Sequence, residues 1–237
     1  MPDCRVEFAG ESVLRVVNAN GEESSTYLDN LWLKYQQGEE DRSELIEKYI
    51  RLAQDLGKES PGADKQNVIA MIKDSRYLGF LRPLEEFATE HLCGDLWIIY
   101  AEDQPERTLT LKREDIRAVE SDEARLRSLS VENLKRILPP AECHGEGPWY
   151  LLTAGSDYVA SLLLLDGIWD QVADMVAGEV VATVPTRAVL LFTGSESREG
   201  LREIQGRSTE ICNSAPHAIS DTLIVRRNGK WSVFNAN

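Results

Sequence analysis

Two turns hold the four residues that are the best candidates for a binding surface. Ser156, Asp157 and Tyr158 lie in the segment TAGSDY, and Arg187 follows Pro185 between two apolar runs. Hydroxyl, carboxylate and guanidinium groups together can bind a polar partner through hydrogen bonds and ion pairs. In an ordinary hairpin turn, the proline would instead fix the backbone and the arginine would keep an exposed edge from pairing with other chains.

The predicted topology decides whether these two turns meet. Residues 158–165 are predicted as a strand, followed by a helix and a second strand at 179–184. If the two strands are parallel neighbours, as β-α-β units usually are, Arg187 lies at the opposite end of the sheet from Ser156. Only an antiparallel arrangement would bring Arg187 to Asp157. The pattern therefore favours separated turns, with a joint surface as the alternative.

Motifs for catalysis or for metal binding do not emerge from the sequence. Ser156 follows a glycine but lies between predicted strands, without the strand-to-helix elbow of a hydrolase nucleophile. The phosphate-binding glycine motifs are absent. His91 with Cys93, and Cys143 with His144, lack the spacing of zinc ligands. We therefore predict no cofactor and no metal, and the catalytic residues, if there are any, stay unknown.

Composition points to a cytoplasmic protein. The net charge of −14 at pH 7 repels nucleic acid and anionic lipid, so we expect neither as a partner. The N-terminal residues lack the pattern of a signal peptide, and no apolar run is long enough to span a membrane. The scattered cysteines indicate reduced thiols; they are Cys4, Cys93, Cys143 and Cys212.

Helical and strand patterns alternate along the chain, which predicts an α+β fold with largely antiparallel sheets. Residues 1–62 are expected to hold a strand hairpin and two helices, over about 26–36 and from Asp41 onward. A linker rich in Gly, Pro and charge follows at 57–65. Two β-α-β-β-α units are predicted beyond it, at 63–140 and at 141–237.

Two hairpins are predicted in the last third of the chain. Asn228-Gly229 between alternating runs is a strong signal for a tight turn. Ser195 or Ser197 is expected to cap the helix that lies between the hairpins. The paired strands are expected at 180–184 with 188–192, and at 223–227 with 230–234.

An internal duplication would explain the similar order of the two predicted units. Segments 67–120 and 158–213 each enter their second strand through a glycine, an acidic residue and an apolar residue, at 94–96 and at 178–180. The alternative is chance, because β-α-β-β-α is a common order and the short match is weak. Superposition of the two segments would distinguish these explanations.

Several blocks resemble the YtpQ-like bacterial family, a domain of unknown function. They include LTAGSDYVASLLLLDGIWDQV, GEVVATVPTRAVLLF, YLDNLWLKY, VIAMIKDSRYL, GDLWIIYAED and HAISDTLIVRRNGKW. The resemblance implies a soluble bacterial protein without an established activity, so it supplies no catalytic residues. One turn departs from the family pattern Pro-Ala-Arg-Asp, since residues 185–188 read Pro-Thr-Arg-Ala here.

Two classes of function remain open at this point. The first is a non-catalytic module that binds a protein, with Ser156, Asp157, Tyr158 and Arg187 as its possible surface. The second is a hydrolase-type enzyme with a cleft between the two repeat units. The lack of a nucleophile, metal or phosphate motif favours the binding module.

Overall fold

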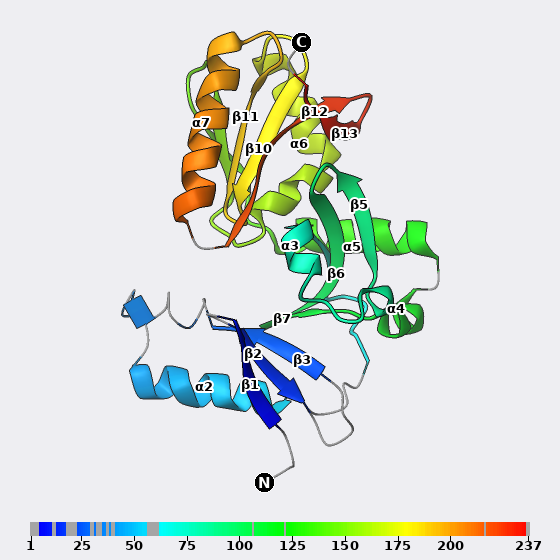
Figure 1. Ribbon diagram of the computed structural model, residues 1–237. Coiled ribbons are helices and arrows are strands. Elements are labelled where there is room, and N and C mark those ends of the chain that lie inside the picture. The colour runs from blue at the N-terminus through cyan, green and yellow to red at the C-terminus, as the bar shows by residue number, and fades with distance from the viewer. Residues whose placement is uncertain are drawn as a thin grey trace. The chain divides into compact units, whose positions relative to one another are not determined.

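The chain forms two compact units, Met1–Pro61 and Gly62–Asn237, and the predicted linker at 57–65 contains the division. The computed structural model describes residues 5–10, 13–17, 23–28, 31, 35–36, 38, 41–55, 62–105, 107–120, 122–215 and 217–235. Both units combine helix with antiparallel sheet, so the predicted α+β class is confirmed (Figure 1).

Unit 1 holds a three-stranded antiparallel sheet in the order β1-β2-β3. The predicted hairpin is confirmed, but residues 26 and 27, expected to begin a helix, belong to the third strand. Of that predicted helix, residues 31, 35 and 36 are helical, and 29–30 and 32–34 lie outside the described residues. The second helix begins as expected, with the Asp41 carboxylate accepting a hydrogen bond from the Ser43 amide at 2.8 Å. The elements are β1 (Arg5–Gly10), β2 (Val13–Val17), β3 (Glu23–Tyr27) and α2 (Arg42–Asp55).

The first sheet of unit 2 is built around β6, which pairs antiparallel with three other strands. Between its first strand, at 68–74, and the strand at 89–93, the chain is helical only in two short pieces. The strands are β4 (Val68–Asp74), β5 (Thr89–Cys93), β6 (Leu96–Gln104) and β7 (Arg107–Thr110). The helices are α3 (Ser75–Leu78), η1 (Leu84–Glu86), α4 (Arg113–Val119) and α5 (Glu123–Ile137).

The second sheet of unit 2 has the order β13-β12-β10-β11-β9-β8, with every pair antiparallel. Both predicted hairpins are confirmed. The strands are β8 (Glu142–His144), β9 (Tyr150–Thr153), β10 (Val180–Thr186), β11 (Val189–Gly194), β12 (Ala218–Arg227) and β13 (Lys230–Val233). Helix α7 (Arg198–Ser214) is capped by Ser197, as predicted, and packs against β10, β11 and β12 (Figure 1).

The predicted strand at 158–165 is wrong. Residues Val159–Leu164 form a 3-10 helix, η2, which α6 (Asp166–Val172) and η3 (Ala173–Met175) follow. The run SLLLL lacks alternation, with its first three residues buried and its last two partly buried, so its pattern fits a buried helix as well as a strand. The first segment has the order β4-α3-η1-β5-β6-β7-α4 and the second η2-α6-η3-β10-β11-α7, so neither follows the predicted β-α-β-β-α order and the duplication is not confirmed.

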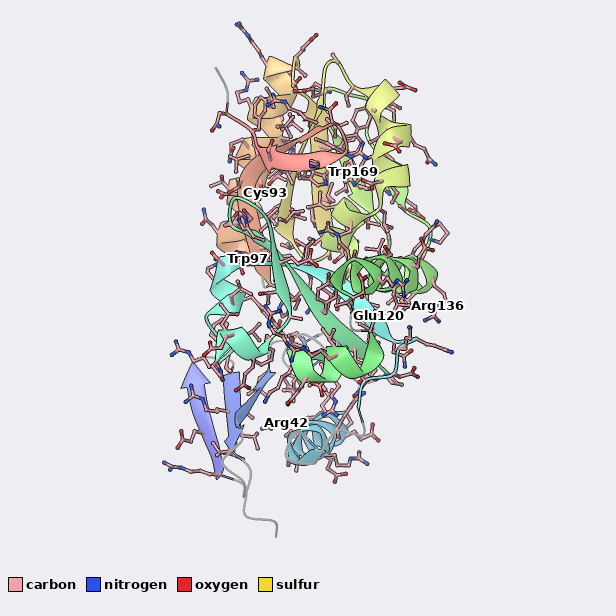
Figure 2. All side chains as sticks on the ribbon, turned by 90° about the vertical axis from the view of Figure 1, so that its right-hand side faces the viewer. Arg42, Cys93, Trp97, Glu120, Arg136 and Trp169 are labelled. Atoms are coloured by element: carbon pink, nitrogen blue, oxygen red, sulfur yellow. The ribbon has the colours of Figure 1, made fainter. Side chains whose placement is uncertain are left out.

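One hydrophobic core is shared by residues from both sheets of unit 2. At its centre the Trp169 ring meets Phe192 and Trp231 edge to face, with ring centroids 6.0 and 4.8 Å apart. The Trp169 and Trp231 indoles donate hydrogen bonds to the carbonyls of Leu162 and Leu163, at 2.8 and 2.9 Å. Because these acceptors belong to η2, the aromatic core fixes that helix in place. Figure 2 labels Trp169 on α6.

Helix α7 begins in very close contact with its surroundings. A Cβ atom on Gly200 would lie 2.1 Å from the Thr193 hydroxyl and 2.3 Å from the Pro148 carbonyl. By contrast, a Cβ on Gly206, two turns further along the helix, would meet nothing within 4 Å. Only the first of these glycines is required by packing.

None of the helices in the ranges described above is long and apolar enough to cross a membrane.

Candidate functional site

Helix η2 brings the two candidate turns together. The Ala160 amide donates to the Arg187 carbonyl at 3.0 Å, and Arg187 Nε lies 2.9 Å from Asp157 Oδ1. The favoured prediction, with the turns at opposite ends of the sheet, is wrong because it depended on a strand at 158–165. The joint arrangement, stated as the alternative, is the one observed.

Arg187 is largely enclosed, since its side chain is 16% exposed against 59% for Asp157. The turn that carries Arg187 joins β10 and β11, which are both interior strands of their sheet. An arginine there has no sheet edge to protect, so the ordinary-turn interpretation does not explain it. The guanidinium instead holds the turn at 155–158 through the carboxylate of Asp157.

Tyr158 and Ser156 are fixed by hydrogen bonds within this corner. The Tyr158 hydroxyl donates to Asp103 Oδ1 at 2.5 Å and lies 2.9 Å from the Thr108 hydroxyl. Burial and then the hydrogen bond to Asp103 raise the pKa of Tyr158, so the phenol stays neutral and acts as a donor. Ser156 Oγ accepts from the Tyr158 amide at 3.2 Å, which makes it a turn-forming hydroxyl.

Lys73 belongs to the same corner, although the sequence analysis did not select it. It lies near the end of β4, next to Ile72, whose amide donates to Ser161 Oγ of η2 at 3.0 Å. Its Nζ lies 4.9 Å from the centre of the Tyr77 ring. The Tyr77 hydroxyl in turn lies 2.7 Å from the Thr110 hydroxyl.

The environment of Lys73 disfavours its charged form. Burial lowers the pKa of Lys73 to about 8, and the positive charge of Arg187 adds to this effect, while Asp157 and Asp74 oppose it. Within the described ranges the Lys73 ammonium contacts the face of the Tyr77 ring, donates no hydrogen bond and forms no ion pair. A half-buried ammonium without an acceptor is unusual, because a desolvated charge is costly unless it is paired.

One signal in the sequence could have identified Lys73. It interrupts the apolar run VIAMI, at the strand position after Ile69 and Met71 on the same face. Those two residues are buried in a second hydrophobic cluster. A lysine that continues a buried face must either reach solvent or lose part of its hydration.

The residues considered for zinc are separately placed. His91 Nε2 lies 2.9 Å from the Gly94 carbonyl, and His144 Nε2 lies 3.3 Å from a carboxylate oxygen of Glu142. Cys93 is buried in the core, as expected of a small apolar side chain, and burial raises the pKa of its thiol to about 11. Over the described parts of the chain, no three His, Cys, Asp or Glu side chains gather as a metal site would need. Figure 2 labels Cys93 and Trp97 on the β5–β6 hairpin.

We call the corner formed by these side chains the Lys73–Arg187 surface. Its members are polar or aromatic and come from β4, α3, β7 and the two turns; they are Lys73, Tyr77, Thr108, Asp157, Tyr158 and Arg187. Tyrosine and arginine are the side chains most enriched where proteins bind one another. The arrangement is therefore suited to recognition.

No family model, no curated protein and no solved structure matches the chain.

Proposed function

We propose that the chain is a non-catalytic module that binds a protein partner, and that the Lys73–Arg187 surface is its binding site. The observation that carries this proposal is the ion pair between Arg187 and Asp157 at 2.9 Å, which joins two turns far apart in the sequence into one surface. The chemistry of that surface, and not a match to a known protein, supports the proposal.

The contacts within the surface favour binding over turnover. Tyr158 is held by Asp103, and Ser156 is held by its own turn. Side chains fixed in this way lose little conformational freedom when a partner binds, which strengthens an interface. Ser156 is engaged as an acceptor for a backbone amide, which is a structural role and not that of an activated nucleophile.

The partner that we propose is a protein, in the cytoplasm. The net charge of −14 disfavours binding to nucleic acid, and a protein can complement a surface that mixes both signs of charge. Membership in the YtpQ-like family is likewise a proposal, supported by the blocks of similar sequence and their order along the chain.

Affinity capture from the native organism tests this function with two matched variants. The wild-type chain and Arg227→Ala should capture the same protein, whereas Arg187→Ala should lose it. Arg227 is a suitable control because its ion pair with Glu179 lies on the surface, with the two side chains 55% and 43% exposed. Thermal unfolding must accompany the capture, and we expect Arg187→Ala to cost about 1 kcal/mol, because Asp157 is exposed.

Retention of the partner by a folded Arg187→Ala chain would refute the proposed site. Loss of the partner from Arg227→Ala as well would mean that the effect of Arg187→Ala is not specific to the surface.

A further inference from the structure

We propose that the outer edge of β7 binds an extended, basic segment of the partner protein as an added strand. This inference rests on the proposed function and deepens it, because it says which kind of segment reaches the Lys73–Arg187 surface and through which groups. Addition of a strand to an exposed sheet edge is a general mode of peptide recognition, in which main-chain hydrogen bonds supply the affinity.

The pairing of β6 with β7 shows which backbone groups of β7 point outward. In an antiparallel pair, successive residues of a strand direct their N–H and C=O groups to opposite sides. The Leu111 amide donates to the Tyr100 carbonyl at 2.9 Å, so residue 111 faces β6, and Leu109, two residues earlier, faces it too. The backbone groups of Thr108 and Thr110 therefore point away from β6.

The other side of β6 agrees with this orientation. Asp103 lies opposite Thr108 in the register, but its amide donates to the Asn67 carbonyl at 2.9 Å, on the side of β4. Within the described ranges, the backbone groups of Thr108 and Thr110 have no hydrogen-bond partner outside the pairing with β6. These two residues thus offer two N–H donors and two C=O acceptors at the spacing of an added strand.

Two other sheet edges of unit 2 are covered by side chains. On β4, Ser161 Oγ binds the Ile72 amide at 3.0 Å. On β12, ahead of the residues that pair with β13, the Arg76 guanidinium binds the Ile219 carbonyl at 2.8 Å. Proteins cover edges in this way to prevent pairing with other chains. The outer edge of β7 lacks such a cover among the described residues, so it is open to pairing.

The threonine side chains of β7 connect this edge to the Lys73–Arg187 surface. The Thr108 hydroxyl lies 2.9 Å from the Tyr158 hydroxyl, and the Thr110 hydroxyl lies 2.7 Å from that of Tyr77. Alternate residues of a strand share one face of the sheet, so every second side chain of an added strand would lie on the face that holds these tyrosines. The added strand would therefore contact the surface proposed to bind the partner.

Charge favours a basic segment as the occupant. The charged group of the surface that faces solvent is Asp157, whose side chain is 59% exposed, whereas that of Arg187 is 16% exposed. The whole chain carries a net charge of −14, which attracts lysine and arginine side chains. A second copy of this chain would bring the same negative charge and is disfavoured as the occupant.

Amide hydrogen exchange in the full chain tests the proposal without the native partner. The probe is a synthetic peptide of alternating valine and threonine residues with a lysine at each end, added in excess and followed by NMR. We expect the Thr108 and Thr110 amides to exchange at least about threefold more slowly with the peptide than without it. The same peptide with its central amides N-methylated should have no effect, because it has lost its main-chain donors.

Two proline variants locate the binding on β7. Thr108→Pro removes an outward amide, so the peptide should no longer slow exchange at Thr110. Val233→Pro is the matched control on β13, where Val233 is 38% exposed. The Phe234 amide donates to the Leu223 carbonyl at 2.9 Å, so the Val233 amide also points away from its sheet, and this variant should keep the response at Thr110. Thermal unfolding shows that both variants are folded.

The proposal is overturned if the lysine peptide leaves exchange at Thr108 and Thr110 unchanged, or if the N-methylated peptide slows it equally. Equal slowing by a peptide with glutamate at each end would overturn the basic character of the segment. Slow exchange without peptide that increases with protein concentration would assign the edge to a second copy and overturn the proposal. Loss of the captured partner from Arg187→Ala, together with no peptide response, would keep the proposed function and remove only the added strand.

Discussion

Two enclosed cations in unit 2, Arg226 and Lys73, have opposite electrostatic surroundings. Arg226 on β12 is 12% exposed and contacts Asp166 at 3.0 Å and Asp170 at 2.9 Å. Burial opposes its charge, but the hydrogen bonds to the two carboxylates outweigh burial and raise the pKa of Arg226. Burial also opposes the charge of Lys73. There its effect is larger than that of the nearby carboxylates, and the pKa of Lys73 falls to about 8.

The difference between the two sites comes from what faces the cation. Asp166 and Asp170 are four residues apart on α6, so the helix presents both carboxylates on one side. Lys73 instead contacts an aromatic ring, and burial together with the charge of Arg187 outweighs the opposite effects of Asp157 and Asp74 on its pKa. Burial therefore does not by itself determine the charge state of a cationic side chain: where carboxylates pair with the cation its pKa rises, and where they do not its pKa falls.

Replacing Arg226 should give the largest change in stability. Arg226→Met keeps the apolar stem but removes two hydrogen bonds between charged groups. We expect the free energy of unfolding to fall by about 2 kcal/mol in urea titrations. The neighbouring Arg227→Met is the control, because its ion pair with Glu179 is exposed, and it should change stability by no more than about 0.5 kcal/mol. Equal effects of the two variants would mean that the enclosed pairings of Arg226 contribute nothing beyond a surface ion pair.

Replacing Lys73 should have a smaller effect of opposite sign. Lys73→Met removes the desolvated charge and also the contact with the Tyr77 ring, so the chain should become about 1 kcal/mol more stable at pH 7. Lys112→Met is the control, since Lys112 pairs with Glu86 at 3.0 Å on the surface.

The pH dependence of this difference follows from the direction of the pKa shift. Between about pH 8 and 10.5 the unfolded chain keeps the Lys73 proton and the folded chain has lost it. The unfolded state then binds more protons, so the stability of the wild-type chain rises with pH in this window. The advantage of Lys73→Met should therefore be fully present below pH 8 and disappear toward pH 10.5. An advantage that stays constant with pH would show that the pKa of Lys73 is not lowered.

The smallest effect is expected from Asp157. Its negative charge favours the Lys73 ammonium, so Asp157→Asn should lower the pKa of Lys73 further, by a few tenths of a unit. Titration of the Lys73 side chain by NMR measures the shift, with Asp174→Asn as a control on η3. A rise in the pKa of Lys73 would contradict the assigned role of Asp157.

Local signals predicted the hairpins well. Asn228 and Gly229 adopt positive φ values of 50° and 74°, as the Asn-Gly turn between β12 and β13 requires. The Ser197 cap of α7 is likewise a contact between close neighbours in sequence. By contrast, η2 is held by indole donors and by β4, which lie far from it in sequence or depend on the folded core. The apolar run at 161–165 has neither helix nor strand periodicity, so the sequence does not indicate these contacts.

The candidate site was predictable only in part. Ser156, Asp157, Tyr158 and Arg187 were selected for their residue types, and the structure brings Asp157 and Arg187 together. The sequence favours separated turns because the usual parallel arrangement of β-α-β units depends on a strand at 158–165, and the structure has a 3-10 helix there. Lys73 was missed, since its chemistry depends on burial and on Arg187, more than a hundred residues away in the chain.

The two glycines of α7 leave the helix with unequal room for sequence change. The Thr193 hydroxyl and the Pro148 carbonyl occupy the space that a side chain on Gly200 would need. Any added side chain would therefore push the start of the helix away from β11. Gly206 has open space where a side chain would begin, and an alanine in a helix interior is favoured over glycine by roughly 1 kcal/mol. Among descendants of this chain, substitutions should therefore accumulate quickly at Gly206 and almost never at Gly200, although both lie in the same helix.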